Sequence, residues 1–110
     1  MSWGRAVDEP VVVLDERHAV TIANQAFYRW LNLTAEQVAH VDIFQLKESV
    51  FDSAALRQTI ERDLAPTSPQ ANLQIDLNMD AHVQRFAVDA RRLYTQGEEE
   101  PMTVLVIRAV

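Results

Sequence analysis

Three histidines are the side chains in this sequence that could hold a metal ion or a haem iron. His18, His40 and His82 lie far apart in the chain, and none has a second histidine at the i+4 position or a carboxylate arranged as a co-ligand. Isolated histidines without a ligand motif usually have structural or solvent-exposed roles. We therefore predict that the chain has no metal site.

Paired carboxylates offer a second kind of chemistry, general acid–base catalysis. Asp76 and Asp89 fall on two stretches that are typical of neighbouring strands, and burial in a shared cavity would raise a carboxyl pKa into the range that this chemistry needs. Acids that alternate along a strand usually lie on its solvated face, and Glu98–Glu100 is an acidic run in a loop. We predict that the protein is not an enzyme, and a small α+β acid–base enzyme is kept as a further alternative.

The composition excludes several other classes of site. The 110 residues contain no cysteine, which excludes disulfides, thiolate nucleophiles, cysteine-ligated zinc and a covalent cysteinyl flavin. The net charge of −6, with Lys47 as the only lysine, argues against a nucleic-acid partner. No apolar run reaches membrane-spanning length and the N-terminus is polar, so we expect no direct membrane contact and a cytoplasmic location.

The elements that must position these side chains are organised around the last stretch, Met102–Val110. Both of its faces are almost entirely apolar, with Arg108 as the only charge, whereas a half-exposed strand alternates apolar with polar residues. The stretch therefore predicts a central strand that is covered on both faces. One cover is the core of the domain. The other is a helix, a neighbouring segment or a second copy of the chain, because so much exposed apolar surface would favour association or aggregation.

The rest of the chain predicts four further strands and several short helices. Asn24 and the pair Thr34 and Gln37 are typical helix caps, and Pro66 ends a later helix that begins after Asp52 or Ser53. The predicted strands are 11–14, 19–23, 73–79, 83–94 and 102–110. The predicted helices are 25–31, a short one after Thr34, one turn within 43–51, and a helix that ends at Leu64.

Hairpins between successive strands place the third, fourth and fifth strands side by side. A central last strand must then also pair with the first hairpin, which gives a five-stranded antiparallel sheet in the order 2-1-5-4-3 with the short helices on one face. We therefore predict one α+β domain over residues 10–110. Residues 1–9 form a lead that either frays or, through Trp3 and Val7, caps the exposed face of the sheet.

Two stretches of this sequence resemble a known family. In VVVLDERHAVTIANQAFYRWLNLTAEQV, an apolar strand reaches Asp15, a turn follows, a second strand ends at Ala23–Asn24, and a helix carries Phe27; this pattern resembles the opening of a PAS domain. The later FAVDARRLY resembles the penultimate strand of PAS modules in bacterial sensor kinases and related signalling proteins. The sequence departs from the family at His18, where the turn usually holds a glycine, and at Asp89, which replaces an asparagine.

The resemblance covers residues 10–110 and implies a PAS-like fold that acts as a sensory and interaction module in a two-component or similar signalling protein. The Asp-Ile-Thr that commonly follows the last strand in the family is missing after Val110, which suggests a domain excised from a larger protein. A small apolar ligand held between helices and sheet would shift the helices and bias a dimer or an attached helix. We predict that this pocket is lined by Val13, Phe27, Phe44, Leu56, Ile60, Phe86 and Val88.

The identity of a ligand stays open from the sequence. A haem would need a proximal histidine, for which His40 is the only candidate by position, so haem is not expected, and a noncovalent flavin has no visible signature. The alternative is a domain whose core is closed by its own side chains and which serves only to dock or dimerise. In either case we expect a homodimer formed through the outer face of the sheet or the N-terminal segment.

Overall fold

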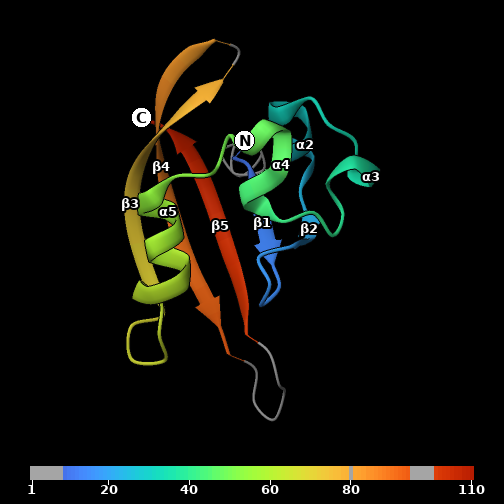
Figure 1. Cartoon of the computed structure of the whole chain (residues 1–110). Coiled ribbons are helices and arrows are strands. Elements are labelled where there is room, and N and C mark those ends of the chain that lie inside the picture. The colour runs from blue at the N-terminus through green and yellow to red at the C-terminus, as the bar shows by residue number, and fades with distance from the viewer. Residues whose placement is uncertain (1–8, 80, 95–100) are drawn as a thin grey trace, which may run out of the picture.

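The fold is built on one antiparallel sheet in the strand order β2-β1-β5-β4-β3. The computed structural model describes residues 9–79, 81–94 and 101–110. The helices lie on one face of the sheet (Figure 1), which confirms the predicted α+β architecture. The strands are β1 Val11–Leu14, β2 Val20–Ala23, β3 Gln70–Met79, β4 His82–Leu93 and β5 Met102–Ala109. The helical elements are α2 Gln25–Leu31, α3 Ala35–Val38, η1 Ile43–Gln45, α4 Leu46–Ser49, α5 Ala54–Gln58 and η2 Thr59–Asp63.

Strand β5 lies in the middle of the sheet, as its apolar faces predict. It pairs antiparallel with β1 on one side and with β4 on the other. Thr103, Leu105 and Ile107 face the helices and are buried, whereas Val104 and Val106 are half-buried on the opposite face. The inner cover of β5 is therefore the core of the domain.

The helix starts follow the caps that the sequence predicts. The Asn24 side-chain oxygen accepts a hydrogen bond from the Phe27 amide at 3.0 Å. The Thr34 hydroxyl accepts from the Gln37 amide, and the Gln37 side chain accepts from the Thr34 amide at 2.8 Å, which is a complete capping box. The α3 helix that follows ends at Val38, so this part of the chain forms only one short helical segment.

The helix predicted to end at Leu64 changes its pitch halfway. After α5, η2 continues as a π-helix, in which the Leu64 amide donates to the Thr59 carbonyl at 3.1 Å. The Arg92 guanidinium of β4 donates to the Ile60 carbonyl at 2.5 Å and to the Thr103 hydroxyl of β5 at 3.3 Å. Arg92 therefore ties this helix to strands β4 and β5.

The turn between β1 and β2 has a backbone conformation that favours glycine. His18, which replaces the glycine usual in the family, has a φ of 69°, and the left-handed region costs a non-glycine residue roughly 1 kcal/mol. The Asp15 carboxylate compensates by accepting hydrogen bonds from the Arg17 and Ala19 amides at 2.8 and 3.0 Å. The hairpin is thus held by side-chain hydrogen bonds rather than by a glycine.

Candidate functional site

Most of the residues predicted to line a pocket lie together in the core. Six of the seven are each exposed by 4% or less and belong to one cluster of buried side chains. They are Phe27, Phe44, Leu56, Ile60, Phe86 and Val88. Whether a ligand enters among them stays a prediction.

The prediction that Val13 faces the same interior is wrong. Its neighbours Val12 and Leu14 are the buried residues of β1, and successive side chains of a strand point to opposite faces. Val13 is half-buried on the outer face, where it pairs with Ile22 of β2 and Val104 of β5. Val13 therefore belongs to the outer surface of the sheet.

Aromatic rings fill the interior around Phe27. Phe27 and Phe51 stack with ring centroids 6.3 Å apart and an angle of 15° between the planes. Trp30 meets Phe51 and Phe86 edge-on, with centroid distances of 5.7 and 5.2 Å. Rings in these arrangements stabilise one another beyond the area that they bury, and here they occupy the space between α2 and the sheet.

The outer face of the sheet is divided into an apolar half and a polar half. Over β2, β1 and β5 the outward side chains are mostly aliphatic, and Ile22 among them is 62% exposed. The aliphatic ones are Val11, Val13, Ile22, Val104 and Val106, and Arg108 of β5 lies on the same face. Over β4 and β3 the outward side chains are mostly polar or charged, and include Gln70, Asn72, Gln74, Asp76, Arg85, Asp89 and Arg91.

The two acids considered for catalysis both lie on this polar half. The Arg85 guanidinium donates to the Asp76 carboxylate at 3.0 Å, and this hydrogen bond lowers the pKa of Asp76. Asp89 accepts from the Gln70 side chain at 3.4 Å and lies 3.5 Å from the Arg91 guanidinium. Because a general acid needs a raised pKa, Asp76 is poorly suited to that role.

Replacing Arg85 by glutamine should raise the pKa of Asp76 towards its ordinary value, because the substitution removes both the hydrogen bond and the positive charge. The pKa of Asp76 is lower in the folded chain than in the unfolded one, so this pair contributes stability above the unfolded pKa and loses it as the pH falls. An NMR pH titration of the Asp76 carboxyl carbon measures the change. Arg91→Gln, an exposed arginine on the same face of β4, is the matched control and should leave Asp76 unchanged; equal titration curves for both variants would contradict the assignment.

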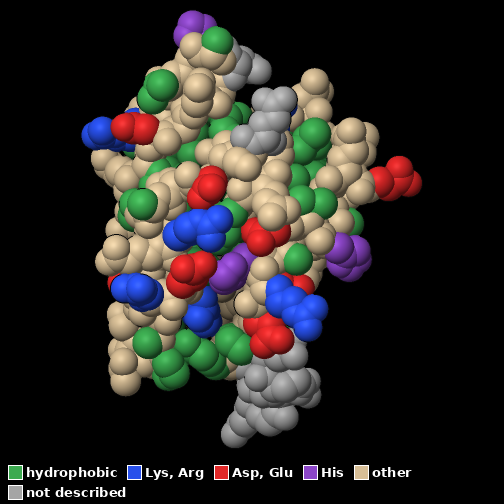
Figure 2. Space-filling view, viewed as in Figure 1, with side chains coloured by type: hydrophobic (Ala, Val, Ile, Leu, Met, Phe, Trp, Pro, Cys, Tyr) green, Lys and Arg blue, Asp and Glu red, His purple; other side chains and the backbone are tan. Residues whose placement is uncertain are grey.

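The histidine nearest to the core packs against an aromatic ring. His18 meets Phe44 edge-on at 5.5 Å, and the Arg57 guanidinium lies 4.2 Å from the centre of the same ring. Arg57 also pairs with Asp52 at 2.8 Å and with Glu61 at 3.6 Å. Figure 2 shows acidic and basic side chains intermingled across the middle of the helical face, the face that carries these pairs.

The other candidates for ligation do not gather around His18. His40 and His82 are exposed, and no group of three histidine, cysteine or acidic side chains in the described ranges could hold a metal ion. Trp3, Val7 and Glu98–Glu100 lie outside the described residues, so the cap and the solvated acidic loop stay predictions. None of the helices described here has the length and hydrophobicity to cross a bilayer.

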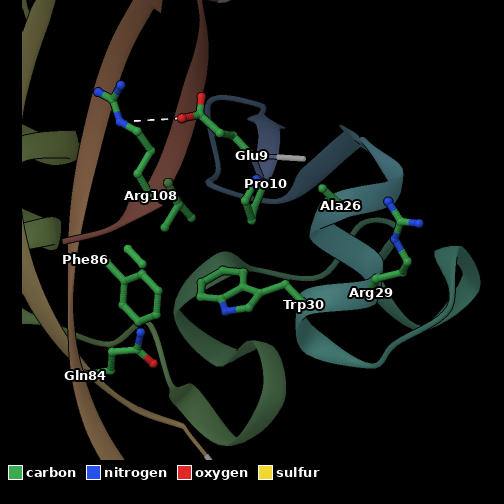
Figure 3. Close-up of a pocket in the computed structure, with 10 residues that line it drawn as sticks. Glu9, Pro10, Ala26, Arg29, Trp30, Gln84, Phe86 and Arg108 are labelled. Atoms are coloured by element: carbon green, nitrogen blue, oxygen red, sulfur yellow. Dashed lines mark ion pairs between the residues drawn. The ribbon is translucent and has the colours of Figure 1, made fainter. Parts of the chain in front are cut away.

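A cleft of about 690 Å³ opens at the end of the sheet where β1 begins and β5 ends. Figure 3 shows the Trp30 ring projecting from α2 towards Phe86 of β4, with Gln84 beside it. On the opposite side of the cleft, Arg108 extends towards Glu9, and their charged atoms are 3.9 Å apart. Phe86 is the one predicted pocket residue that lines this cleft, whereas Ile60 lines a smaller polar hollow of about 240 Å³.

Asn24 fixes the two walls of this cleft relative to each other. Its side-chain oxygen accepts from the Val11 and Phe27 amides, both at 3.0 Å, and its side-chain amide donates to the Glu9 carbonyl at 2.9 Å. The residue therefore caps α2 and also holds the start of β1. The sequence predicts the first role alone, because the other two hydrogen bonds depend on β1 lying alongside the helix start.

Comparison with known proteins gives a consistent result. The sequence matches the PAS fold family over residues 5–110, and no curated protein sequence matches it significantly. The PAS domain of BvgS from Bordetella pertussis superposes with a TM-score of 0.73 at 16% identity, over 99% of this chain and 85% of that chain. The PAS domain of an HTR-like protein from Haloarcula marismortui gives 0.69 at 14% identity, over 99% and 92% of the two chains. The PAS domain of nitrogen regulation protein NR(II) from Vibrio parahaemolyticus gives 0.68 at 14% identity, over 94% and 90%.

At these identities the superpositions show a shared fold, and they agree with the family match, which spans the five strands and all the described helices. The chain therefore belongs to the PAS fold family.

Proposed function

We propose that this PAS domain is a non-catalytic sensory and interaction module of a signalling protein, and that it works by docking onto a second copy of itself through the outer face of its sheet. The similar solved structures include a PAS domain from a two-component sensor histidine kinase, which supports a signalling role. The observation that carries the docking proposal is the apolar half of the outer face, formed by Val11, Val13, Ile22, Val104 and Val106.

A two-fold interface suits this surface for a physical reason. The apolar side chains form cross-strand rows, one of which runs from Ile22 through Val13 to Val104, so they present a flat strip that a copy of itself can cover. Burial of apolar surface in water is favourable by about 25 cal/mol per Å². The polar half of the same face, over β4 and β3, would stay in water outside this interface, because charged side chains are costly to bury.

The packed interior favours docking alone over an internal ligand. Phe27, Phe51 and Trp30 occupy the space beneath the helices with ring-to-ring contacts, and tightly packed cores leave few voids. Native mass spectrometry of the purified chain, with an absorbance spectrum, separates the two possibilities. A mass equal to two bare chains supports docking alone, and a retained small molecule would instead support the predicted internal pocket.

A charge placed in the apolar half of the outer face is expected to dissociate the dimer. Ile22→Glu changes a side chain that is already 62% exposed, so the fold should tolerate it, while an unpaired charge in an interface should weaken association about tenfold or more. Sedimentation velocity over a concentration series measures the dissociation constant. Gln74→Glu, which adds the same charge to the polar half of the same face, is the matched control and should leave association unchanged.

Two results would contradict the docking proposal. One is a wild-type chain that stays monomeric up to concentrations of about 500 µM, which corresponds to an association too weak for a specific interface. The other is a dimer that Ile22→Glu and Gln74→Glu affect equally, because such a dimer would use another surface.

A further inference from the structure

We propose that the cleft between α2, the start of β4 and the end of β5 binds a neutral purine base of the adenine type, with the base stacked on Trp30 and its hydrogen-bonding edge on the Gln84 side chain. Of the residues predicted to line an interior pocket, Phe86 alone lines this cleft, and the proposal does not depend on the docking proposed above. The cleft volume of about 690 Å³ falls in the range of roughly 300–1,000 Å³ that small-molecule sites commonly have.

The wall of the cleft on the inner face of the sheet is apolar apart from one side chain. Phe86 and Ile107 are buried and form its floor, and Ala109 lies opposite Phe86 in the β4–β5 ladder. Gln84 precedes Phe86 by two residues and so lies on the same face of β4. It is the one polar side chain that the described residues contribute to this wall. The apolar members of the wall are Pro10, Ala26, Trp30, Phe86, Ile107 and Ala109.

The charged side chains at the cleft point away from this wall. Arg108 follows buried Ile107 in β5 and therefore lies on the outer face of the sheet, where it extends towards Glu9. Figure 3 shows the Arg29 guanidinium directed away from Trp30. A molecule against the inner wall therefore meets none of the charged groups that the described residues contribute to the cleft. Because a charge without a partner is costly to bury, the wall favours a neutral ligand.

Trp30 and Gln84 together suit a purine base. The Trp30 ring is half-buried and rests on Phe86 at a centroid distance of 5.2 Å, and aromatic side chains of this kind are the surfaces on which bases stack. Gln84 is exposed, and Figure 3 places its side-chain amide beside the Phe86 ring, at the same end of the cleft as Trp30. This amide offers a donor next to an acceptor, the pair that matches the N7 atom and the amino group of adenine.

The walls of the cleft are held in place without a ligand. Asn24 ties the Glu9 carbonyl and the Val11 amide to the start of α2, and the Ile107 amide donates to the Pro10 carbonyl at 3.0 Å. The helix, the start of β1 and the end of β5 are thus joined by hydrogen bonds. A site that is formed in advance loses little affinity to ordering its own side chains.

Titration with adenine, followed in two-dimensional ¹⁵N NMR spectra, tests this assignment, with unsubstituted purine as the matched probe. Adenine should shift the amides of Gln84, Phe86 and Ala109 and the indole N–H of Trp30. It should bind about fivefold more tightly than purine, because purine keeps the rings but lacks the amino group that donates to Gln84.

Substitution of Gln84 tests the hydrogen-bonding edge. Gln84→Leu keeps a side chain of similar size and removes both the donor and the acceptor, so adenine should then bind no more tightly than purine. Gln74→Leu makes the same change at an exposed glutamine on the outer face of β3 and should leave the preference for adenine unchanged. Far-UV circular dichroism of both variants checks that the fold is retained.

Adenosine and adenosine 5′-monophosphate test whether a ribose or a phosphate attached to the base contributes. The monophosphate should bind no more tightly than adenosine, because the charged side chains of the cleft lie outside its inner wall and the net charge of −6 disfavours an anion. Tighter binding of the monophosphate would contradict a neutral ligand.

Three further outcomes would overturn the proposal. The first is no shift of the cleft amides at adenine concentrations of about 5 mM, which fill most of a site whose dissociation constant is about 1 mM. The second is an equal effect of Gln84→Leu and Gln74→Leu on adenine binding, because Gln84 would then not recognise the base. The third is shifts centred on interior residues such as Leu56 and Val88, because the probe would then enter the core.

Discussion

Replacing Phe27 by alanine should lower the free energy of unfolding by about 3–5 kcal/mol, the range measured for large-to-small changes at fully packed aromatic sites. Phe27 is fully buried and contacts the rings of Tyr28, Trp30 and Phe51. The substitution removes these contacts and leaves a cavity that the surrounding rings close only in part. Unfolding in guanidinium chloride, followed by far-UV circular dichroism, measures the loss.

A second substitution at Phe27 tests whether the loss of stability comes from the lost side-chain volume. Phe27→Leu keeps most of the side-chain volume and should cost less than about 1.5 kcal/mol. If Phe27→Ala were as mild as Phe27→Leu, the space around Phe27 would not be closely packed. That result would favour an interior cavity for a ligand over the packed core on which the docking proposal relies.

Replacing Asn24 by alanine should cost about 2–3 kcal/mol, although the side chain is small and only half-buried. The substitution breaks three hydrogen bonds at once, with the backbones of Glu9, Val11 and Phe27. It therefore uncaps α2 and releases the start of β1 in the same step. Denaturant unfolding measures the change in stability, and hydrogen exchange of the Val11 and Phe27 amides locates it.

Two control substitutions give stability losses with which the loss in Asn24→Ala can be compared. Asn24→Asp keeps the accepting oxygen but loses the donor to Glu9, so its cost should fall between that of the wild type and that of Asn24→Ala. Asn72→Ala changes an exposed asparagine of β3 and should be nearly neutral. A loss in Asn24→Ala no greater than that in Asn72→Ala would contradict the bridging role.

The sequence predicts the topology well because the deciding signals are local. The apolar faces of β5 place it in the centre of the sheet, and the caps at Asn24 and Thr34 mark where helices begin. Each signal depends on residues within a few positions of one another. The strand order then follows from the hairpins and from the central place of β5.

The orientation of β1 could not be predicted in the same way. Its sequence, Val11–Leu14, is apolar at every position, so no alternation indicates which side chains face the core. The choice is made by pairing with β5, which sets Val12 beside buried Leu105 and Val13 beside half-buried Val104. A strand with two apolar faces takes its orientation from its partner, and for this reason the prediction for Val13 is wrong.

The cleft could not be predicted from local sequence patterns either. Its lining comes from the start of β1, from α2, from the start of β4 and from the end of β5, which meet only once the sheet has formed. Trp30 is recognisable from the sequence as an apolar residue of α2, but its contact with Phe86 joins positions 56 residues apart. Gln84 is a polar residue on the face of its strand that also carries Phe86 and Val88, and this is the one signal in the sequence that could have drawn attention to the site.

The central place of β5 has a consequence for how the chain is made. In the described residues, the pair β1–β2 and the pair β3–β4 share no ladder with each other and meet only through β5. Synthesis proceeds from the N-terminus, so both hairpins and all the described helices leave the ribosome before the strand that unites them. Until Met102–Ala109 emerges, β1 and β4 each present an unpaired edge, the kind of surface on which nascent chains aggregate. The pairing of β5 with both strands therefore covers both of these edges in one step.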